Sequence, residues 1–273
     1  MERKISFSSY DGTSLTGIYQ SPDGVPCQAL LMMHGLPSNK DEWGFYQDMA
    51  AFFESQDIAT FRFDFRFNGE SETGSLTNLT IAAMINDIES AFWQLQDCLK
   101  SNVPISVVGT SAGGGVTAAW CHAYMRKVNR IFLMAPVLDY EYEVTGKLKQ
   151  LKENDFTQLQ PGILELLKTK GGLNSDINYG YPFINEAHLF NIREQFKNID
   201  SLVTIFHGDK DSIVPLAITK DCIAGFSRIE LIVVKDADHG FAVEGDDNLI
   251  APGTKINHQF VYREILNRIT NGK

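Results

Sequence analysis

Gly109-Thr110-Ser111-Ala112-Gly113 is the stretch of this sequence that decides the fold. It fits the pattern G-x-S-x-G, and it lies between an apolar run that predicts a strand, residues 103–109, and a segment that predicts a helix, residues 113–125. A serine at such a sharp strand-to-helix turn sits in strained backbone with its hydroxyl exposed. The flanking glycines leave room where strand and helix approach each other. Ser111 is therefore a candidate nucleophile.

The sequence around this turn carries no Asp, Glu, Lys or Arg from Ser101 to Met125, which is long enough to suggest a membrane span. However, Pro104 and three consecutive glycines interrupt the stretch. A buried strand, a glycine-rich turn and a buried helix explain it better, and no membrane span is predicted.

Strand and helix patterns alternate on both sides of the turn. Apolar or alternating runs predict further strands at residues 5–8, 15–19, 29–33, 58–63, 131–134, 202–206 and 231–234. The first two strands flank the turn signal Asp11-Gly12 and predict a hairpin. Helical spacing predicts helices at residues 43–55, 81–99, 216–224 and 256–269. The fold class is therefore α/β, with a mostly parallel central sheet and helices on both faces.

Residues 139–200 interrupt this alternation. The segment is longer than one strand-helix unit needs, is dense in charge over residues 141–155, and turns aromatic at residues 179–183. We predict an inserted helical cap, with residues 1–138 and 201–273 forming one core domain. A surface excursion that does not contact substrate is the alternative.

A serine hydroxyl needs a base to become nucleophilic, and the base needs a third group to orient it. His239 follows the last predicted strand, where a loop can carry it to the same sheet edge as Ser111. A surface histidine without a role is the alternative. The acid is predicted to be Asp211, in the loop after another strand, while Asp209 and Asp238 remain open.

Acyl chemistry also needs two hydrogen-bond donors aimed at the oxyanion. Ala112 can supply one backbone N–H, and Leu36 can supply the other from the loop after an early strand. Pro37 has no N–H and is excluded as a donor.

The sequence resembles the α/β-hydrolase family over nearly its whole length, and within it cinnamoyl and feruloyl esterase-like members and related capped serine hydrolases. The motifs that carry the resemblance are residues 34–40, 64–71, 109–113, 208–211 and 238–240. The resemblance implies the α/β-hydrolase fold, the order Ser111, Asp211, His239, oxyanion donors at Leu36 and Ala112, and a lid at residues 139–200. Thr110 and Ala112 stand where many relatives carry His and a larger residue, so only backbone donors are expected there.

Composition excludes several other classes of protein. A net charge of −10 disfavours binding to nucleic acid, and four scattered cysteines do not suggest a disulfide framework. No metal-ligand spacing and no nucleotide-binding fingerprint occurs, so neither a metal nor a cofactor is expected. The first ten residues contain no apolar signal region, which predicts a cytoplasmic location.

Three hypotheses follow. The first is a hydrolase that cleaves carboxylic esters of small molecules through an acyl-enzyme on Ser111. The second is a thioesterase or acyltransferase for acyl groups carried by a protein or coenzyme A. The third is a binding protein that keeps the fold without catalysis. The sequence predicts no oligomeric state.

Overall fold

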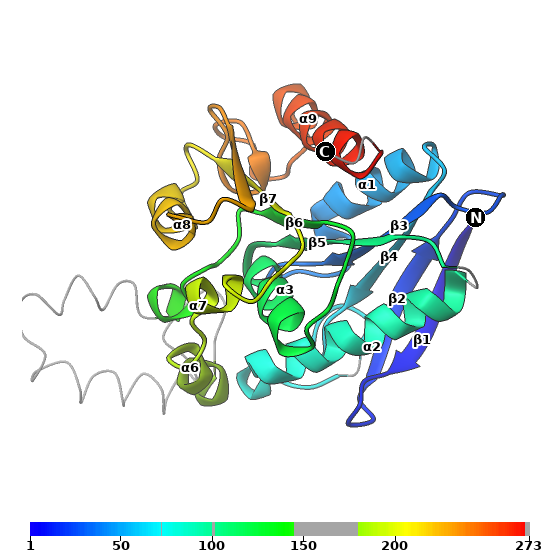
Figure 1. The fold of residues 1–273 in the computed structure, drawn as a ribbon, viewed down its shortest axis with the longest axis horizontal. Helices are drawn as coiled ribbons and strands as arrows, with labels where there is room; N and C mark the ends of the chain where they lie inside the picture. Colours follow the sequence, from blue (N-terminus) through cyan, green and yellow to red (C-terminus); the bar gives the residue numbers. More distant parts are fainter. Residues whose placement is uncertain (72, 100–101, 145–179, 271–273) are drawn as a thin grey trace, which may run out of the picture.

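The chain folds around one sheet, seen in a computed structural model that describes residues 1–71, 73–99, 102–144 and 180–270 (Figure 1). The eight strands follow the order β1-β2-β4-β3-β5-β6-β7-β8. Their bounds are β1 Glu2–Ser8, β2 Ser14–Gln20, β3 Gln28–Met33, β4 Ile58–Asp64, β5 Ile105–Thr110, β6 Ile131–Met134, β7 Val203–Gly208 and β8 Ile229–Val234. β1 pairs antiparallel with β2, and β2 pairs antiparallel with β4, while the remaining pairs are parallel.

Helices cover both faces of the sheet. The helix α1 (Phe45–Glu54) and the C-terminal helix α9 (Pro252–Thr270) lie together on one face (Figure 1). The other face carries α2 (Ile81–Leu99) and α3 (Ser111–Ala123). The shorter helix α8 (Leu216–Ile223) follows β7. The described residues also form three 3₁₀ turns, η1 (Glu42–Gly44), η2 (Leu76–Asn78) and η3 (His239–Phe241).

The central strands are apolar on both sides because each side is covered. In β3, Leu30 and Met32 pack in the core beneath α1 and α9, whereas Leu31 and Met33 pack in the core beneath α2 and α3. All four side chains are fully buried. The predicted α/β class, the hairpin and the mostly parallel sheet are confirmed.

Three predicted helices differ from the observed ones at their starts. The C-terminal helix expected at residues 256–269 begins earlier, at Pro252. The helix expected from residue 43 is divided, because Trp43 has φ 56° and Gly44 has φ 85°, so that α1 begins only at Phe45. The helix expected from residue 113 begins at Ser111, two residues earlier. Ser111 has φ 52°, and this left-handed residue lets the chain leave β5 and enter α3 without a linker.

Residues 145–179, the larger part of the predicted cap, lie outside the described residues, so the cap stays a prediction. The C-terminal end of the segment 139–200, residues 180–200, is described and contains α6 (Tyr181–Ala187) and α7 (Ile192–Phe196). Phe183, Ile192 and Phe196 are buried in the same core as α2 and α3. This end of the segment is therefore built into the core of the fold.

The turn between β5 and α3 has no space for side chains at its glycines. A Cβ on Gly113 would lie 2.2 Å from the carbonyl oxygen of His34, and a Cβ on Gly109 would lie 2.4 Å from Thr117 Oγ1. Since the obstacle at Gly113 is backbone, the neighbouring strand end would have to move. Glycine at this position brings the start of α3 against the end of β3.

We expect Gly113→Ala to destabilise the fold by roughly 1–3 kcal/mol, the usual cost of overpacking, and to lower the melting temperature by several degrees. Alanine favours helix by up to about 1 kcal/mol over glycine, but the backbone clash outweighs this. Gly24→Ala is the matched control, since nothing lies within 4 Å of its added Cβ. Equal melting temperatures for both variants, measured by circular dichroism, would contradict the tight-turn explanation.

Candidate active site

Ser111 lies at the end of β5 and is the first residue of α3, near the middle of the sheet. Its carbonyl oxygen accepts a hydrogen bond from Val137 N–H at 2.9 Å, which ties the strained turn to the chain after β6. The side chain lies at the amino end of a helix, where free N–H groups and the helix dipole favour negative charge. This is the position that the sequence predicts for a nucleophile.

His239 and Asp211 meet at the same edge of the sheet. Asp211 follows β7, and His239 opens the 3₁₀ turn η3 after β8. His239 Nδ1 lies 3.0 Å from Asp211 Oδ2 and 3.2 Å from Oδ1. Because Nδ1–H donates to this carboxylate, Nε2 is left as a proton acceptor.

The other two carboxylates left open by the sequence hold the surrounding loops. Asp209 accepts a hydrogen bond from Asp236 N–H at 2.7 Å. Asp238 accepts one from Ser212 N–H at 2.8 Å and caps the turn that begins at His239. Of these three carboxylates, Asp211 is therefore the one that contacts the imidazole of His239.

A second histidine supports Asp211 from the opposite side. His207 is fully buried in β7, and its Nε2 lies 3.3 Å from Asp211 Oδ2 and 2.9 Å from the carbonyl oxygen of Val214. The N–H groups of Ile213 and Val214 donate to Asp211 Oδ1 at 3.0 and 2.8 Å. These donors fix the orientation of the carboxylate. Sequence reasoning missed His207, which closes an apolar strand and carries no motif of its own.

These contacts shift the pKa of both partners. Burial raises the pKa of Asp211, but hydrogen bonds from His207 and His239 outweigh it and hold the pKa well below its usual range. Burial lowers the pKa of His239, but Asp211 and the nearby carboxyl groups of Glu42 and Glu143 raise it above its usual value. Asp211 is thus ionised at neutral pH, and His239 holds its proton more tightly than a free imidazole.

The buried side chain of His34 fixes the loop that carries Leu36. His34 Nε2 accepts from Phe65 N–H at 3.0 Å, so its Nδ1–H donates to the carbonyl oxygen of Gly35 at 2.6 Å. Since N–H and C=O of a trans peptide point in opposite directions, this bond also sets the direction of Leu36 N–H. Among the described residues, nothing accepts a hydrogen bond from the N–H of Leu36 or of Ala112.

Glu42 holds the same loop from the other side, and sequence reasoning missed it. Its side chain is buried, and Oε2 accepts from Gly35 N–H at 2.9 Å. Burial raises the pKa of Glu42 to about 7, against the lowering effects of Gly35 N–H and His239. The sequence placed Glu42 next to a predicted helix, where an acidic residue suggests a solvent-facing position.

Glu42 lies near Ser111 and also affects the pKa of His239. A Cβ on Gly35 would lie 3.1 Å from Ser111 Cβ and 3.2 Å from Glu42 Oε1, so Gly35, Ser111 and Glu42 meet at the loop that carries Leu36. The charges of Glu42 and His239 shift each other's pKa. The described residues show no hydrogen bond between Ser111 Oγ and His239. Such bonds are often long before substrate binds.

In the part of the chain that the structure describes, no three His, Cys, Asp or Glu side chains gather as a metal site. A search of the same residues for a helix of membrane-spanning length and apolarity finds none.

We expect nuclear magnetic resonance titration to place the pKa of His239 above 6.5, its ordinary value. Asp211→Asn removes the charge that favours the imidazolium, so the pKa of His239 should fall. Asp209→Asn is the matched control, because its carboxylate binds only the backbone of Asp236 among the described residues. A His239 pKa that does not respond to Asp211→Asn would contradict this electrostatic coupling.

Comparison with known proteins gives consistent matches. The model of the family described as serine aminopeptidase, S33, matches residues 24–182, more than half of the chain. The chain is 22% identical over 247 residues to monoacylglycerol lipase ABHD6 of Mus musculus, covering 79% of this chain and 71% of that protein.

Solved structures show the same fold. Est1E from Butyrivibrio proteoclasticus with bound ferulic acid has a TM-score of 0.72 at 16% identity, over 96% of this chain and 99% of the other. Alpha/beta hydrolase domain-containing protein 10 from mouse has a TM-score of 0.68 at 20% identity, over 99% and 100% of the two chains. The resemblance to the α/β-hydrolase fold inferred from the sequence is confirmed.

Proposed function

Since the chain belongs to the serine aminopeptidase S33 family of α/β-hydrolases, we propose that it cleaves carboxylic esters through an acyl-enzyme formed on Ser111. The observation that supports this most is the contact of His239 Nδ1 with Asp211 Oδ2 at 3.0 Å, at the sheet edge that also carries Ser111. This contact leaves His239 Nε2 free to accept a proton.

In the proposed reaction, His239 Nε2 takes the proton of Ser111 Oγ as that oxygen attacks the ester carbonyl. The N–H groups of Leu36 and Ala112 stabilise the oxyanion, and Asp211 stabilises the imidazolium. The C–O bond to the alcohol breaks, and His239 donates its proton to the leaving oxygen. Water then attacks the acyl-enzyme by the same route and releases the acid, which regenerates Ser111.

An ester is the substrate class favoured by the relatives. The mouse relative is named a monoacylglycerol lipase, and Est1E was solved with ferulic acid, a carboxylic acid. A thioester would undergo the same steps with a thiol as the leaving group, so thioesterase or acyltransferase activity is the alternative. Acyl transfer would differ in product, because an added alcohol or thiol would receive the acyl group in place of water.

We expect the protein to hydrolyse 4-nitrophenyl acetate and alkyl esters, and Ser111→Ala to lower kcat by about 10⁶-fold, as for other serine nucleophiles. The initial rates of an ester and thioester panel test this, with product analysis by chromatography in the presence of added acceptors. Undiminished hydrolysis by Ser111→Ala would rule out the proposed acyl-enzyme. A wild type that turns over only thioesters would favour the alternative.

The pH dependence of kcat/KM tests whether Glu42 raises the pKa of His239. Protonated His239 cannot act as a base, so kcat/KM should fall at low pH with a midpoint above 6.5, the ordinary histidine pKa. Glu42→Gln keeps an acceptor for Gly35 N–H and removes the carboxyl group whose ionised form, about half of it near pH 7, raises the His239 pKa. We expect this variant to shift the midpoint to lower pH and to keep most of kcat.

Glu42→Ala is the paired variant, because it also removes the acceptor of Gly35 N–H and frees the loop of residues 34–40 that carries the proposed donor Leu36, which we call the oxyanion loop. We expect it to lower kcat by roughly 10- to 100-fold, somewhat less than the loss of an oxyanion donor. If both variants kept the kcat and the pH profile of the wild type, Glu42 would act on neither the loop nor His239.

A further inference from the structure

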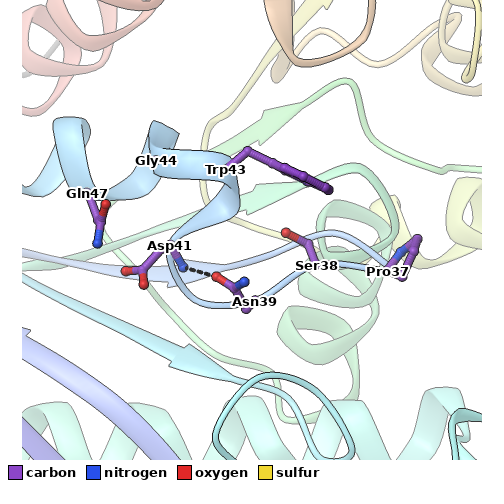
Figure 2. A pocket seen from close by; sticks show the side chains of 7 residues that line it. All are labelled: Pro37, Ser38, Asn39, Asp41, Trp43, Gly44 and Gln47. Carbon is purple, nitrogen blue, oxygen red and sulfur yellow. Dashed lines mark hydrogen bonds between the residues drawn. The ribbon is translucent and has the colours of Figure 1, made fainter. Parts of the chain in front are cut away.

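A pocket of about 420 Å³ opens beside the oxyanion loop, between that loop and the start of α1 (Figure 2). Pro37 directly follows the proposed donor Leu36 and lines the pocket, together with Ser38, Asn39, Asp41, Trp43 and Gln47. A group in this pocket would therefore lie beside the loop that presents Leu36 N–H. We call it the Trp43 pocket.

The indole of Trp43 is presented to the pocket by a strained turn. Trp43 is 70% exposed and has φ 56°, and Glu42 before it has φ 46°. Two successive left-handed residues with large side chains cost about 1–2 kcal/mol each. In Figure 2 the indole reaches from this turn toward Ser38 on the oxyanion loop, instead of packing in the core.

Hydrogen bonds within the turn and to the oxyanion loop maintain this strained conformation. Glu42 N–H donates to the carbonyl oxygen of Asn39 at 2.9 Å, Gly44 N–H donates to that of Asp41 at 2.9 Å, and the Glu42 side chain is fixed by Gly35 N–H. The turn thus directs Glu42 inward to the oxyanion loop and Trp43 outward to the pocket. Strain retained beside a reaction site is a common sign of function.

The lining of the pocket points to a neutral ligand. Asn39 and Gln47 carry carboxamides, Ser38 carries a hydroxyl, and no cationic side chain is among the lining residues. Asp41 is the only lining carboxylate, and it is paired with Arg62 Nε at 2.9 Å. An anion would find no countercharge here, and a cation would have to compete with Arg62. An exposed indole beside neutral donors and acceptors suits the C–H face and the hydroxyl groups of a sugar ring.

We propose that the Trp43 pocket is the subsite for the alcohol part of the ester, and that this part is a neutral hydroxylated ring such as a sugar. This rests on the proposed ester hydrolysis. Polar lining suits an alcohol with several hydroxyl groups, whereas an aliphatic acyl chain needs an apolar channel. Trp43 stacks on the ring, and Asn39 and Gln47 hydrogen-bond its hydroxyl groups.

The test compares acetate esters that differ only in the alcohol: 6-O-acetylglucose, glycerol monoacetate, butyl acetate and acetylcholine. We expect Trp43→Ala to raise KM for 6-O-acetylglucose roughly three- to tenfold, the value of one aromatic contact. The kcat for this ester and both constants for butyl acetate should stay near the wild type. Trp93→Ala is the matched control, a tryptophan of α2 that is 47% exposed and does not line the pocket.

Three outcomes would overturn the proposal. An equal loss for all four esters would mean that Trp43 acts only on the structure of the loop. A selective loss for acetylcholine would assign the pocket to a cation, and a selective loss for glycerol monoacetate would assign it to an open-chain polyol. Melting temperatures of both tryptophan variants verify that the fold is retained.

A second measurement separates this proposal from ester hydrolysis itself. Methyl glucoside is titrated into the Ser111→Ala protein, and the indole N–H resonance of Trp43 is followed, assigned by its absence in Trp43→Phe. A saturable shift of this resonance, without change at Trp93 or Trp120, supports the pocket even where the wild type hydrolyses no ester. No shift up to high millimolar glucoside contradicts the pocket, whatever the activity of the wild type.

Discussion

The arrangement of the candidate site depends on one backbone constraint, the turn at Ser111. A non-glycine residue with φ 52° joins β5 directly to α3, at a cost of about 1–2 kcal/mol. The close approach of Gly113 to His34 and the bond from Val137 N–H hold the turn in place. The same approach brings the end of β3, and with it the oxyanion loop, beside Ser111. The carboxyl ends of the parallel strands then bring Asp211 and His239 to the same edge.

Buried charge is the second feature of the site, and it is concentrated around His239. Asp211 contacts the imidazole directly, while Glu42 and Glu143 raise its pKa from further away. Asp211 is held ionised by His207 and by backbone N–H groups. Among the described residues, fewer donors reach Glu42, chiefly Gly35 N–H, and its pKa is raised by burial. The two carboxyl groups therefore take different roles. Asp211 orients the proposed base and stabilises its protonated form, and Glu42 fixes the oxyanion loop.

The sequence predicted those parts of the structure that have a local signature. Ser111, Asp211 and His239 each follow an apolar strand, and Leu36 lies in a loop with a recognisable motif, so their places at one sheet edge could be inferred. Glu42 could not be inferred, because its burial depends on the left-handed turn that interrupts a periodic helical pattern. The Trp43 pocket depends on the same turn. The role of residues 139–200 also stays a prediction, since most of the segment lies outside the described residues.

The central claim is that Ser111 forms the covalent intermediate, and labelling with a fluorophosphonate followed by peptide mass spectrometry tests it most directly. The native protein should gain one phosphonyl group, mapped to the peptide that contains Ser111. Labelling should be lost in Ser111→Ala and in urea, where the site is unfolded. Absence of labelling in the native protein, or a phosphonyl group on another residue, would contradict the proposed mechanism.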